Sequence, residues 1–446
     1  MKRRDFLKTS AALAATAALG SKPLRATNRV VPAGDKVRLG FIGTGRQGRG
    51  LLLSFLKQPE SDIAVLCDVY RTNLDEGAAT FKKRSPEGKA PELISDFRHI
   101  LDRKDIDAVV VATPDHWHAL QTVMACQAGK DVYVEKPTSV TVDEGKKMIA
   151  AARKYKRIVQ VGTQQRSGIH FQKAVEIVQS GRLGKITFVR TWNYGNSAPE
   201  GFGNLPDSDP PADLDWDFWL GPAPKRPYNK NRFGAFPDRW ASFRYFWDYA
   251  GGMVTDWGVH LIDIVLWAMK VNGPQKVSAS GGKLCITDNT ETPDTILVTF
   301  EFPGWICTYE HRNGNGRPIE ARGYGIQFHG TDATLFVDRE GYELVPETRR
   351  VGDKQVPRGE GEKGKNSNNH NDDHARNFLD CLKSRQSPIC DIEIGHRSSA
   401  TCILGNIAFR TGEKVGWDAE KLSVVGSRAA SRMLVRPYRA PWKLKV

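Results

Sequence analysis

The sequence predicts an α/β protein whose N-terminal domain is a doubly wound parallel sheet, and three apolar runs predict it. The run Val37–Ile42 is followed at residues 43–48 by the pattern Gly-x-Gly-x-x-Gly, which opens a helix. The run at residues 63–67 ends in Asp68, 20 residues after the last glycine of that pattern. The run at residues 108–112 has no polar alternation, as is typical of parallel strands buried on both faces.

The glycine pattern predicts a dinucleotide site. The first glycine allows a tight turn, the second lets the backbone approach a pyrophosphate, and the third lets helix and strand pack closely. The helix N-terminus then faces the anion. Asp68 can accept hydrogen bonds from the adenosine ribose and would repel a 2′-phosphate, so NAD is favoured over NADP, although Arg71 lies close in sequence. The residues assigned here to the cofactor are Gly43, Thr44, Gly45, Arg46, Gln47 and Asp68.

The loop after residue 112 extends this site. It contains Thr113, Pro114, His116 and His118, and ligands of doubly wound sheets bind at the carboxyl ends of strands. We expect these four residues to bind the cofactor, the histidines by hydrogen bonds to ribose or phosphate. The alternative is that the histidines cap the next helix, which is predicted over residues 119–128. We assign no metal, because the histidines and cysteines lack the spacing of zinc ligands.

Three later motifs complete a family resemblance. A strand over residues 132–134 ends in Glu-Lys-Pro at 135–137, and Gly-Thr-Gln-Gln-Arg stands at 162–166. Gly-Gly-Met-Val-Thr-Asp-Trp-Gly-Val-His-Leu-Ile-Asp stands at 251–263. With the glycine pattern, these motifs resemble the glucose–fructose oxidoreductase / inositol dehydrogenase (Gfo/Idh/MocA) family over residues 37 to about 410.

The resemblance implies the domain organisation. It implies an NAD-binding Rossmann domain over residues 35–160 and a substrate-binding and oligomerisation domain over residues 161–446. The second domain is expected to be α+β, with a large open, mostly antiparallel sheet that supports homodimers or tetramers. Within it, residues 352–371 are rich in Lys, Gly, Asn and Glu and are predicted to be a disordered loop. Helices are predicted over residues 373–383 and 397–410.

Lys136, Asp256 and His260 fall on the family's catalytic residues, and their side chains suit oxidation of a sugar hydroxyl. Lys136 can supply positive charge beside a developing alkoxide. Asp256 and His260 are four residues apart, so both lie on one face if the segment after Gly252 is helical. His260 is then the acid/base, because an imidazole titrates near neutral pH, and Asp256 orients either His260 or the substrate.

Further site residues follow from the resemblance and from the aromatic content. Glu135, Lys136 and Gln164 are expected to contact the cofactor, and Arg166 the substrate. Six tryptophans lie between residues 190 and 260, and aromatic rings suit the apolar faces of sugars. Those predicted to line the substrate site flank the catalytic segment or a strand end: Trp192, Tyr194, Trp247 and Tyr249.

Residues 1–26 are predicted to be a twin-arginine export signal. Arg3 and Arg4 are followed by Phe-Leu-Lys at residues 6–8 and by an alanine-rich apolar run that is too short to span a bilayer. The alternatives are an ordinary secretory signal and a buried helix. Because this route carries folded proteins, the protein can load its cofactor before export. In the periplasm a retained cofactor must be returned to its starting redox state by the reaction itself.

Composition excludes other classes. Removing residues 1–26 lowers the net charge from +14 to +9, but there is no arginine-rich arm and no lysine run interleaved with aromatics, so no nucleic-acid partner is predicted. No membrane partner is predicted either. The seven cysteines form no Cys-x-x-Cys pair and are expected to be buried thiols.

Together, these features predict an NAD-dependent oxidoreductase that acts on a hydroxyl of a carbohydrate. The alternative is a redox-neutral glycosidase that uses transient oxidation and elimination, as NAD-dependent N-acetylgalactosaminidases of related fold do. Glu-Lys-Pro at residues 135–137 departs from those glycosidases and favours the dehydrogenase. The complete set of Lys136, Asp256 and His260 argues against a non-catalytic sugar-binding protein.

Overall fold

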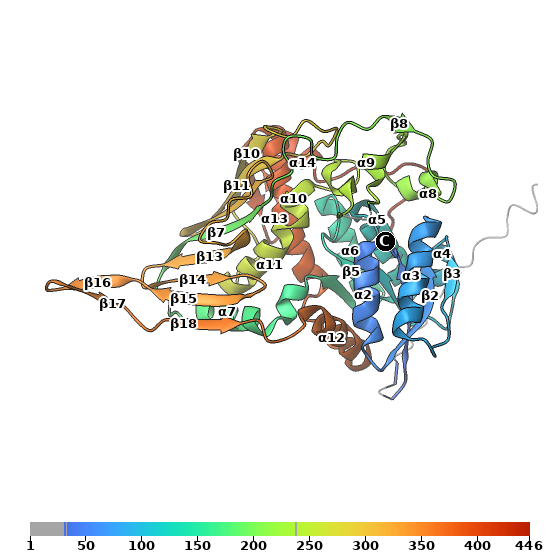
Figure 1. The fold of residues 1–446 in the computed structure, drawn as a ribbon, viewed down its shortest axis with the longest axis horizontal. Helices are drawn as coiled ribbons and strands as arrows, with labels where there is room; N and C mark the ends of the chain where they lie inside the picture. The colour runs from blue at the N-terminus through green and yellow to red at the C-terminus, as the bar shows by residue number, and fades with distance from the viewer. Residues whose placement is uncertain (1–30, 33, 237–238) are drawn as a thin grey trace, which may run out of the picture.

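The computed structural model describes residues 31–32, 34–236 and 239–446, so the predicted export signal lies outside the described residues. Two sheets organise the described chain (Figure 1). The first has six parallel strands in the order β3-β2-β1-β4-β5-β6. The second has ten strands and is mostly antiparallel. The predicted fold class is therefore confirmed.

The first sheet is doubly wound. Strand β1 pairs with β2 on one side and with β4 on the other, so the strand order reverses between β1 and β4. A ligand crevice forms at such a switch point, beyond the carboxyl ends of the strands. The strands are β1 Val37–Ile42, β2 Ser61–Cys67, β3 Glu92–Ile94, β4 Ala108–Val111, β5 Asp131–Glu135 and β6 Val159–Gly162. The helices are α2 Arg46–Leu56, α3 Arg71–Arg84, α4 Arg98–Asp102, α5 Asp115–Gln127 and α6 Val142–Lys154.

The turn between β1 and α2 needs its glycines. Gly43 has a φ of +94°, and a Cβ there would lie 2.7 Å from the carbonyl of Ala112 at the end of β4. A Cβ on Gly48 would lie 2.1 Å from the carbonyl oxygen of Gly43. A Cβ on Gly45, by contrast, would come no closer than 3.7 Å to Asn73. The first and third glycines thus pack the turn, and the second leaves room in front of it.

The second sheet has the strand order β18-β15-β14-β13-β7-β12-β11-β10-β19-β20. Its central strand β7 runs parallel to β12 and antiparallel to β13. Helices α7, α11 and α13 contribute to the large core on one face. The strands are β7 Ile186–Tyr194, β10 Lys276–Gly282, β11 Thr295–Phe302, β12 Trp305–Arg312, β13 Tyr324–Gly330, β14 Ala333–Val337, β15 Gly341–Pro346, β18 Glu362–Lys365, β19 Val415–Asp418 and β20 Ser423–Val425.

The other elements of this part are mostly short. The α-helices are α7 Ile169–Gln179, α8 Trp216–Leu220, α9 Lys230–Phe233, α10 Gly252–Asp256, α11 Gly258–Met269, α12 His370–Ser384, α13 Ile392–Thr411 and α14 Arg428–Arg432. The 3₁₀ turns are η1 Gln164–Ser167 and η2 Ser242–Tyr245, and the small strand pairs are β8 Asp207–Ser208 with β9 Tyr228–Asn229, and β16 Thr348–Val351 with β17 Lys354–Pro357. The two predicted C-terminal helices correspond to α12 and α13, each longer than predicted.

The predicted disorder of residues 352–371 is wrong. β17 pairs with β16 in a hairpin that projects from the body in Figure 1, and β18 extends the large sheet by pairing with β15. Glu362 of β18 accepts hydrogen bonds from Tyr342 and Arg182. α12 starts at His370, within the same stretch. The polar composition reflects an exposed sheet edge, where charged residues are normal, and does not prevent backbone pairing.

Two C-terminal segments pack against the first domain and cross the predicted boundary. Phe378 of α12 lies edge-on to Phe55 of α2 and to Tyr133 of β5. Near the C-terminus, Trp442 packs against Trp117 of α5, with ring centres 4.9 Å apart. Figure 1 shows the chain end returning to this side of the molecule. The C-terminal part of the chain thus completes the packing of the first domain.

Several buried histidines predict that the fold weakens in acid. Burial lowers the pKa of His116 and His396 to about 3 and that of His311 and His374 to about 4. Because these values lie below the ordinary 6.5, the unfolded chain binds more protons between pH 6.5 and 4. The free energy of unfolding should therefore fall as the pH drops through that window, by up to about 1.4 kcal/mol per pH unit for each histidine. Urea denaturation at pH 5 and pH 7 measures this difference.

The control is His311→Gln. The Nδ1 atom of His311 lies 3.0 Å from Asn193 Oδ1 in the interior, a contact that an amide can replace. This variant should lose less stability between pH 7 and pH 5 than the parent does. Equal stability of the parent at the two pH values would show that these imidazoles are not buried in neutral form.

Candidate active site

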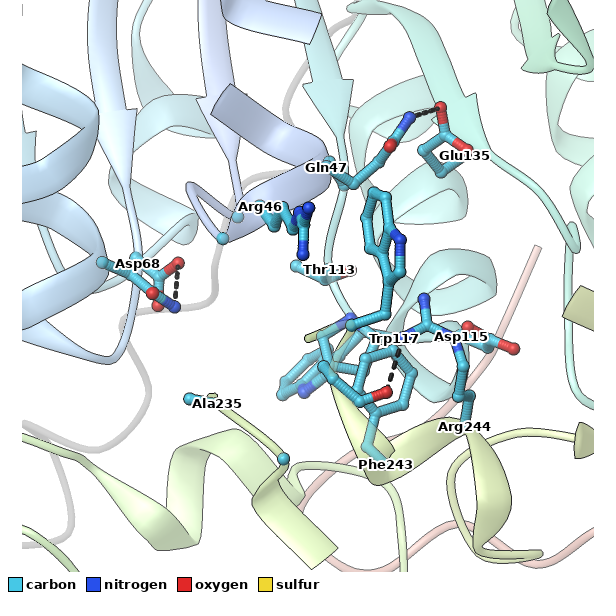
Figure 2. A pocket seen from close by; sticks show the side chains of 18 of the residues that line it. Arg46, Gln47, Asp68, Thr113, Asp115, Trp117, Glu135, Ala235, Phe243 and Arg244 are labelled. Atoms are coloured by element: carbon cyan, nitrogen blue, oxygen red, sulfur yellow. Dashed lines mark hydrogen bonds between the residues drawn. The ribbon is translucent and has the colours of Figure 1, made fainter. Parts of the chain in front are cut away.

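A cavity of about 930 Å³ lies at the carboxyl ends of β1, β4 and β5, a volume typical of small-molecule sites. Figure 2 shows that its walls come from both halves of the chain, with Arg46, Asp68 and Glu135 from the first domain and Phe243 and Arg244 from the later segment. Among the described residues, no group of three or more His, Cys, Asp or Glu side chains could hold a metal ion. No helix in the same described ranges is long and apolar enough to cross a membrane.

One end of the cavity fits a dinucleotide. Helix α2 begins there with Gly45 at its N-cap, no capping side chain and no acidic residue in its first turn, so its free N–H groups can receive an anion. Asp68 accepts hydrogen bonds from the backbone N–H groups of Thr44 (2.8 Å) and Tyr70 (3.0 Å), which hold its carboxylate beside the glycine turn. Arg71 is paired with Asp75 at 2.8 Å and does not line the cavity.

The middle of the cavity holds the predicted cofactor residues at the ends of β4, β5 and β6. Glu135 is buried and accepts hydrogen bonds from Gln47 (2.9 Å) and Gln164 (2.8 Å). Burial raises the pKa of Glu135, and the charge of Lys136 opposes that shift. The cavity lining also includes Thr113, Pro114 and His118.

The two histidines of the predicted loop lie in helix α5, which starts four residues earlier than predicted, with Pro114 at its N-cap and Asp115 in its first turn. His118 is held between the carbonyl oxygens of Pro137 (2.7 Å) and Thr113 (2.8 Å). His116 does not line the cavity. Its Nε2 contacts the carbonyl oxygen of Trp219 at 3.0 Å within an aromatic cluster, so the prediction that it binds cofactor is wrong.

Lys136, Asp256 and His260 all line the cavity. Lys136 Nζ donates to Asp256 Oδ1 at 2.8 Å and to the Asp256 carbonyl oxygen at 3.0 Å. Asp256 ends the short helix α10 and His260 lies in the first turn of α11, so the two belong to consecutive helices separated at Trp257. Among the described residues, the buried Nδ1 of His260 has no hydrogen-bond partner. The side chain of His260 lines the cavity, although this nitrogen itself is enclosed by protein.

The charges around these groups set their protonation. Burial alone would raise the pKa of Asp256, but the charges of Arg244 and Lys136 and the hydrogen bond from Lys136 outweigh it and lower the pKa. Burial, followed by the charges of Lys136 and Arg339, lowers the pKa of His260 well below its ordinary value. His260 is therefore neutral at pH 7. The expectation that it titrates near neutrality is wrong, because that expectation took no account of burial.

Asp115 is a site residue that the sequence analysis missed. It is buried at the start of α5, lines the cavity, and lies close to Arg244 in Figure 2. Burial and the nearby charge of Asp256 raise its pKa to about 7, so near neutral pH it can either donate or accept a proton. An acidic residue directly after Thr-Pro at a strand end was the available signal.

The segment before α10 supplies further residues that the sequence analysis missed. Arg244 Nε lies 3.3 Å from Asp256 Oδ1, which gives this carboxylate a second cation. At the dinucleotide end, the guanidinium of Arg46 lies 4.5 Å from the centre of the Trp240 ring, so this segment reaches the glycine turn. No local pattern marks Arg244 or Trp240.

The five residues predicted to bind substrate do not line the cavity. Arg166 is buried in a two-point ion pair with Asp263, with Nε–Oδ2 at 2.7 Å and Nη2–Oδ1 at 2.9 Å. Trp192 is fully buried and donates its indole N–H to the carbonyl oxygen of Arg322. Tyr194 donates its hydroxyl to Glu310 at 2.8 Å on the sheet.

The remaining two aromatics lie elsewhere. Trp247 lines a second, smaller cavity, where the guanidinium of Arg410 lies 4.8 Å from its ring centre. Tyr249 is fully buried and packs edge-on against Trp219 at 4.9 Å. These substrate assignments are wrong because proximity in sequence to the catalytic segment does not decide which way a side chain faces. The aromatics that do line the cavity include Phe236, Trp240, Phe243, Tyr245 and Trp257.

Comparison with known families agrees with both halves of the fold. The description "Oxidoreductase family, NAD-binding Rossmann fold" matches residues 37–163. "Oxidoreductase family, C-terminal alpha/beta domain" matches residues 168–297 and 361–444. "TAT (twin-arginine translocation) pathway signal sequence" matches residues 1–20. Together, the first two matches cover well over half of the chain.

Individual relatives are more distant. A "Glycosyl hydrolase family 109 protein" of Shewanella pealeana is 28% identical over 202 residues, which are 42% of this chain and 44% of that protein. The chain thus spans less than half the length of the curated relatives it matches. The WlbA dehydrogenase from Bordetella pertussis, crystallised with NADH and UDP-GlcNAcA, superposes with a TM-score of 0.63 at 19% identity, covering 86% of this chain and 99% of that one. Aldose-aldose oxidoreductase from Caulobacter crescentus gives a TM-score of 0.60 at 21% identity over 85% and 99%.

Proposed function

This chain belongs to the Gfo/Idh/MocA oxidoreductase family, with an NAD-binding Rossmann domain and a twin-arginine export signal, and we propose that it oxidises a hydroxyl of a sugar or glycoside. The proposal places the protein in the periplasm with a tightly bound NAD that the reaction recycles. The observation that carries it is the ion pair between Lys136 and Asp256 in the same cavity lining as the imidazole of His260. This group shares one cavity with the dinucleotide end.

The chemistry follows from these side chains. The neutral imidazole of His260, which lines the cavity, can accept the proton of a substrate hydroxyl. The ammonium of Lys136 stabilises the negative charge that develops on that oxygen, and Asp256 holds the ammonium in place. When bound, NAD supplies the acceptor for the hydride of the same carbon. Asp115, beside Asp256 and Arg244, is placed to exchange protons at the same end of the cavity.

Retention of the cofactor is supported by the walls of the cavity. Phe236, Trp240 and Phe243 line it together with the glycine turn, and Trp240 stacks on Arg46. NAD rather than NADP is supported by Asp68, whose carboxylate faces the site while Arg71 is engaged by Asp75. We also propose a homo-oligomer formed through the open sheet, where Leu297 and Ile306 are exposed.

The test is the cofactor content of the purified mature protein. We expect NAD(H) to remain bound through gel filtration and to be released on denaturation. Asp68→Asn should lose most of it, because a charged hydrogen-bond acceptor contributes about 1.5–3 kcal/mol. Asp62→Asn, near the start of the strand that Asp68 follows and paired with Arg38 outside the cavity, should keep it. A sugar should then reduce the retained cofactor, and a second sugar should reoxidise it.

Two results would contradict the proposal. One is a protein that purifies empty and turns over only with a large excess of added NAD. The other is a loaded protein whose nicotinamide absorbance no sugar or glycoside changes.

The second candidate function is a redox-neutral glycosidase. The similarity to a glycosyl hydrolase family 109 protein supports this candidate. Release of an aglycone from a nitrophenyl glycoside, with no net change in nicotinamide absorbance, would identify this activity. Glu-Lys-Pro at residues 135–137, in which the sequence departs from the NAD-dependent glycosidases of related fold, supports the dehydrogenase.

A further inference from the structure

Arg339 brings an unpaired positive charge to the catalytic end of the cavity. It follows β14 and lines the cavity with Trp257, His260 and His370. Its guanidinium carbon lies 4.8 Å from the centre of the Trp257 ring. Its Nε is buried without a hydrogen-bond partner, and no carboxylate of the described residues forms an ion pair with it.

Other arginines around the same core are paired. Arg322, on the same sheet, contacts Glu343 at 2.9 Å and Asp338 at 3.4 Å. Arg166 is paired with Asp263. Because a guanidinium does not lose its proton in proteins, an unpaired one in a largely enclosed site costs free energy that its surroundings must offset. Trp257 offsets part of that cost through its ring face.

The two cavity carboxylates whose charges act on Arg339 already have partners. Asp256 is engaged by Lys136 at 2.8 Å and by Arg244 at 3.3 Å. Glu135 accepts hydrogen bonds from Gln47 and Gln164. The positive charge of Arg339 acts on other residues of the site, because it lowers the pKa of both His260 and His370. A neutral sugar would leave this guanidinium without a counterion.

We propose that the substrate is a sugar acid, such as a uronate or an aldonate, whose carboxylate is bound by the guanidinium of Arg339. This inference rests on the proposed function and names its substrate class. The planar fork of a guanidinium matches a carboxylate with two parallel hydrogen bonds. The single charge of a carboxylate suits one guanidinium beside the anionic Asp256, whereas a phosphate dianion would meet stronger repulsion. The carboxylate serves only for recognition and takes no part in the reaction. The hydroxyl that is oxidised lies elsewhere on the sugar, near His260.

The experiment measures binding and turnover separately in the NAD-loaded protein. D-Glucuronate and D-glucose are titrated while nicotinamide fluorescence is followed in the reduced protein, and kcat/KM is measured for both sugars. We expect glucuronate to bind more tightly than glucose. Arg339→Gln should weaken glucuronate binding by at least about tenfold and leave glucose binding nearly unchanged. Arg339→Lys should recover part of the loss, because it keeps the charge without the fork.

The matched control is Arg358→Gln, which removes one positive charge from an exposed ion pair with Asp332 and does not line the cavity. It should not change the preference for the acid. The inference is overturned if Arg339→Gln weakens both sugars equally, if it lowers the NAD content, or if glucose 6-phosphate binds better than glucuronate. If glucuronate binds through Arg339 but no sugar changes the nicotinamide redox state, the proposed function fails and the binding assignment stands.

Discussion

Lys136→Ala is expected to lower kcat by about 10²–10³-fold while the protein keeps its NAD(H) and its melting temperature. The ammonium lies 2.8 Å from Asp256 and beside His260, where negative charge develops on the substrate oxygen, so its loss is felt mainly in the transition state. The fold should survive, because Asp256 keeps its ion pair with Arg244. Single-turnover reduction of the bound cofactor by an excess of sugar measures the chemical step directly.

Lys136→Arg is the conservative control. It keeps the positive charge and should recover part of the rate, although the larger guanidinium displaces the hydrogen bond to Asp256 Oδ1. Near-normal turnover of Lys136→Ala would remove Lys136 from the mechanism. An empty Lys136→Ala protein would instead give Lys136 a role in holding NAD.

Asp263→Ala is expected to lower the free energy of unfolding by about 3–5 kcal/mol, because it leaves the guanidinium of Arg166 buried without its partner. The side chain of Asp263 is fully buried, that of Arg166 is 6% exposed, and Ser398 also donates to the carboxylate at 2.7 Å. Urea denaturation measures the loss. Substrate KM in the folded fraction should not change, since neither side chain lines the cavity.

The paired variant Arg166→Met/Asp263→Leu is the control. It removes both charges and should recover most of the lost stability, since well-packed apolar residues can replace a buried ion pair. Arg358→Gln, which breaks an exposed ion pair, should change the stability little. A raised KM with unchanged stability in Arg166→Met would restore Arg166 to the substrate site.

Features that depend on neighbouring residues could be predicted from the sequence. The turn at Gly43 requires a positive φ and a close approach to Ala112. Only glycine meets both requirements, so the turn can be recognised in the sequence from glycines at fixed spacing. Asp68 lies at the end of β2 because apolar strand residues precede it directly. Lys136, Asp256 and His260 were found because each stands in a recognisable short motif. Their protonation could not be predicted in the same way, because the pKa of His260 depends on its burial and on Lys136 and Arg339.

The substrate end of the cavity depends on long-range packing. Arg166 resembles a ligand-binding residue until Asp263, 97 residues later, occupies its guanidinium. Trp192 lies on the face of β7 opposite Val189 of the helix-covered core, and it is buried there by Phe336 and Arg322 from distant segments. Arg244, Trp240 and Arg339 reach the cavity from separate segments that no motif connects.

By itself, the sequence determined the Rossmann domain with its NAD-binding turn, the export signal, and the presence of Lys136, Asp256 and His260 in two motifs that meet in the cavity. Each of these is encoded in a run of residues whose backbone geometry or spacing is local. Only the tertiary structure decided which side chains line the cavity and which of the charges there remain unpaired. The physical reason is that burial and ion pairing depend on where distant segments meet. A tryptophan or an arginine is the same letter in the sequence whether its side chain is buried in the core or lines the cavity.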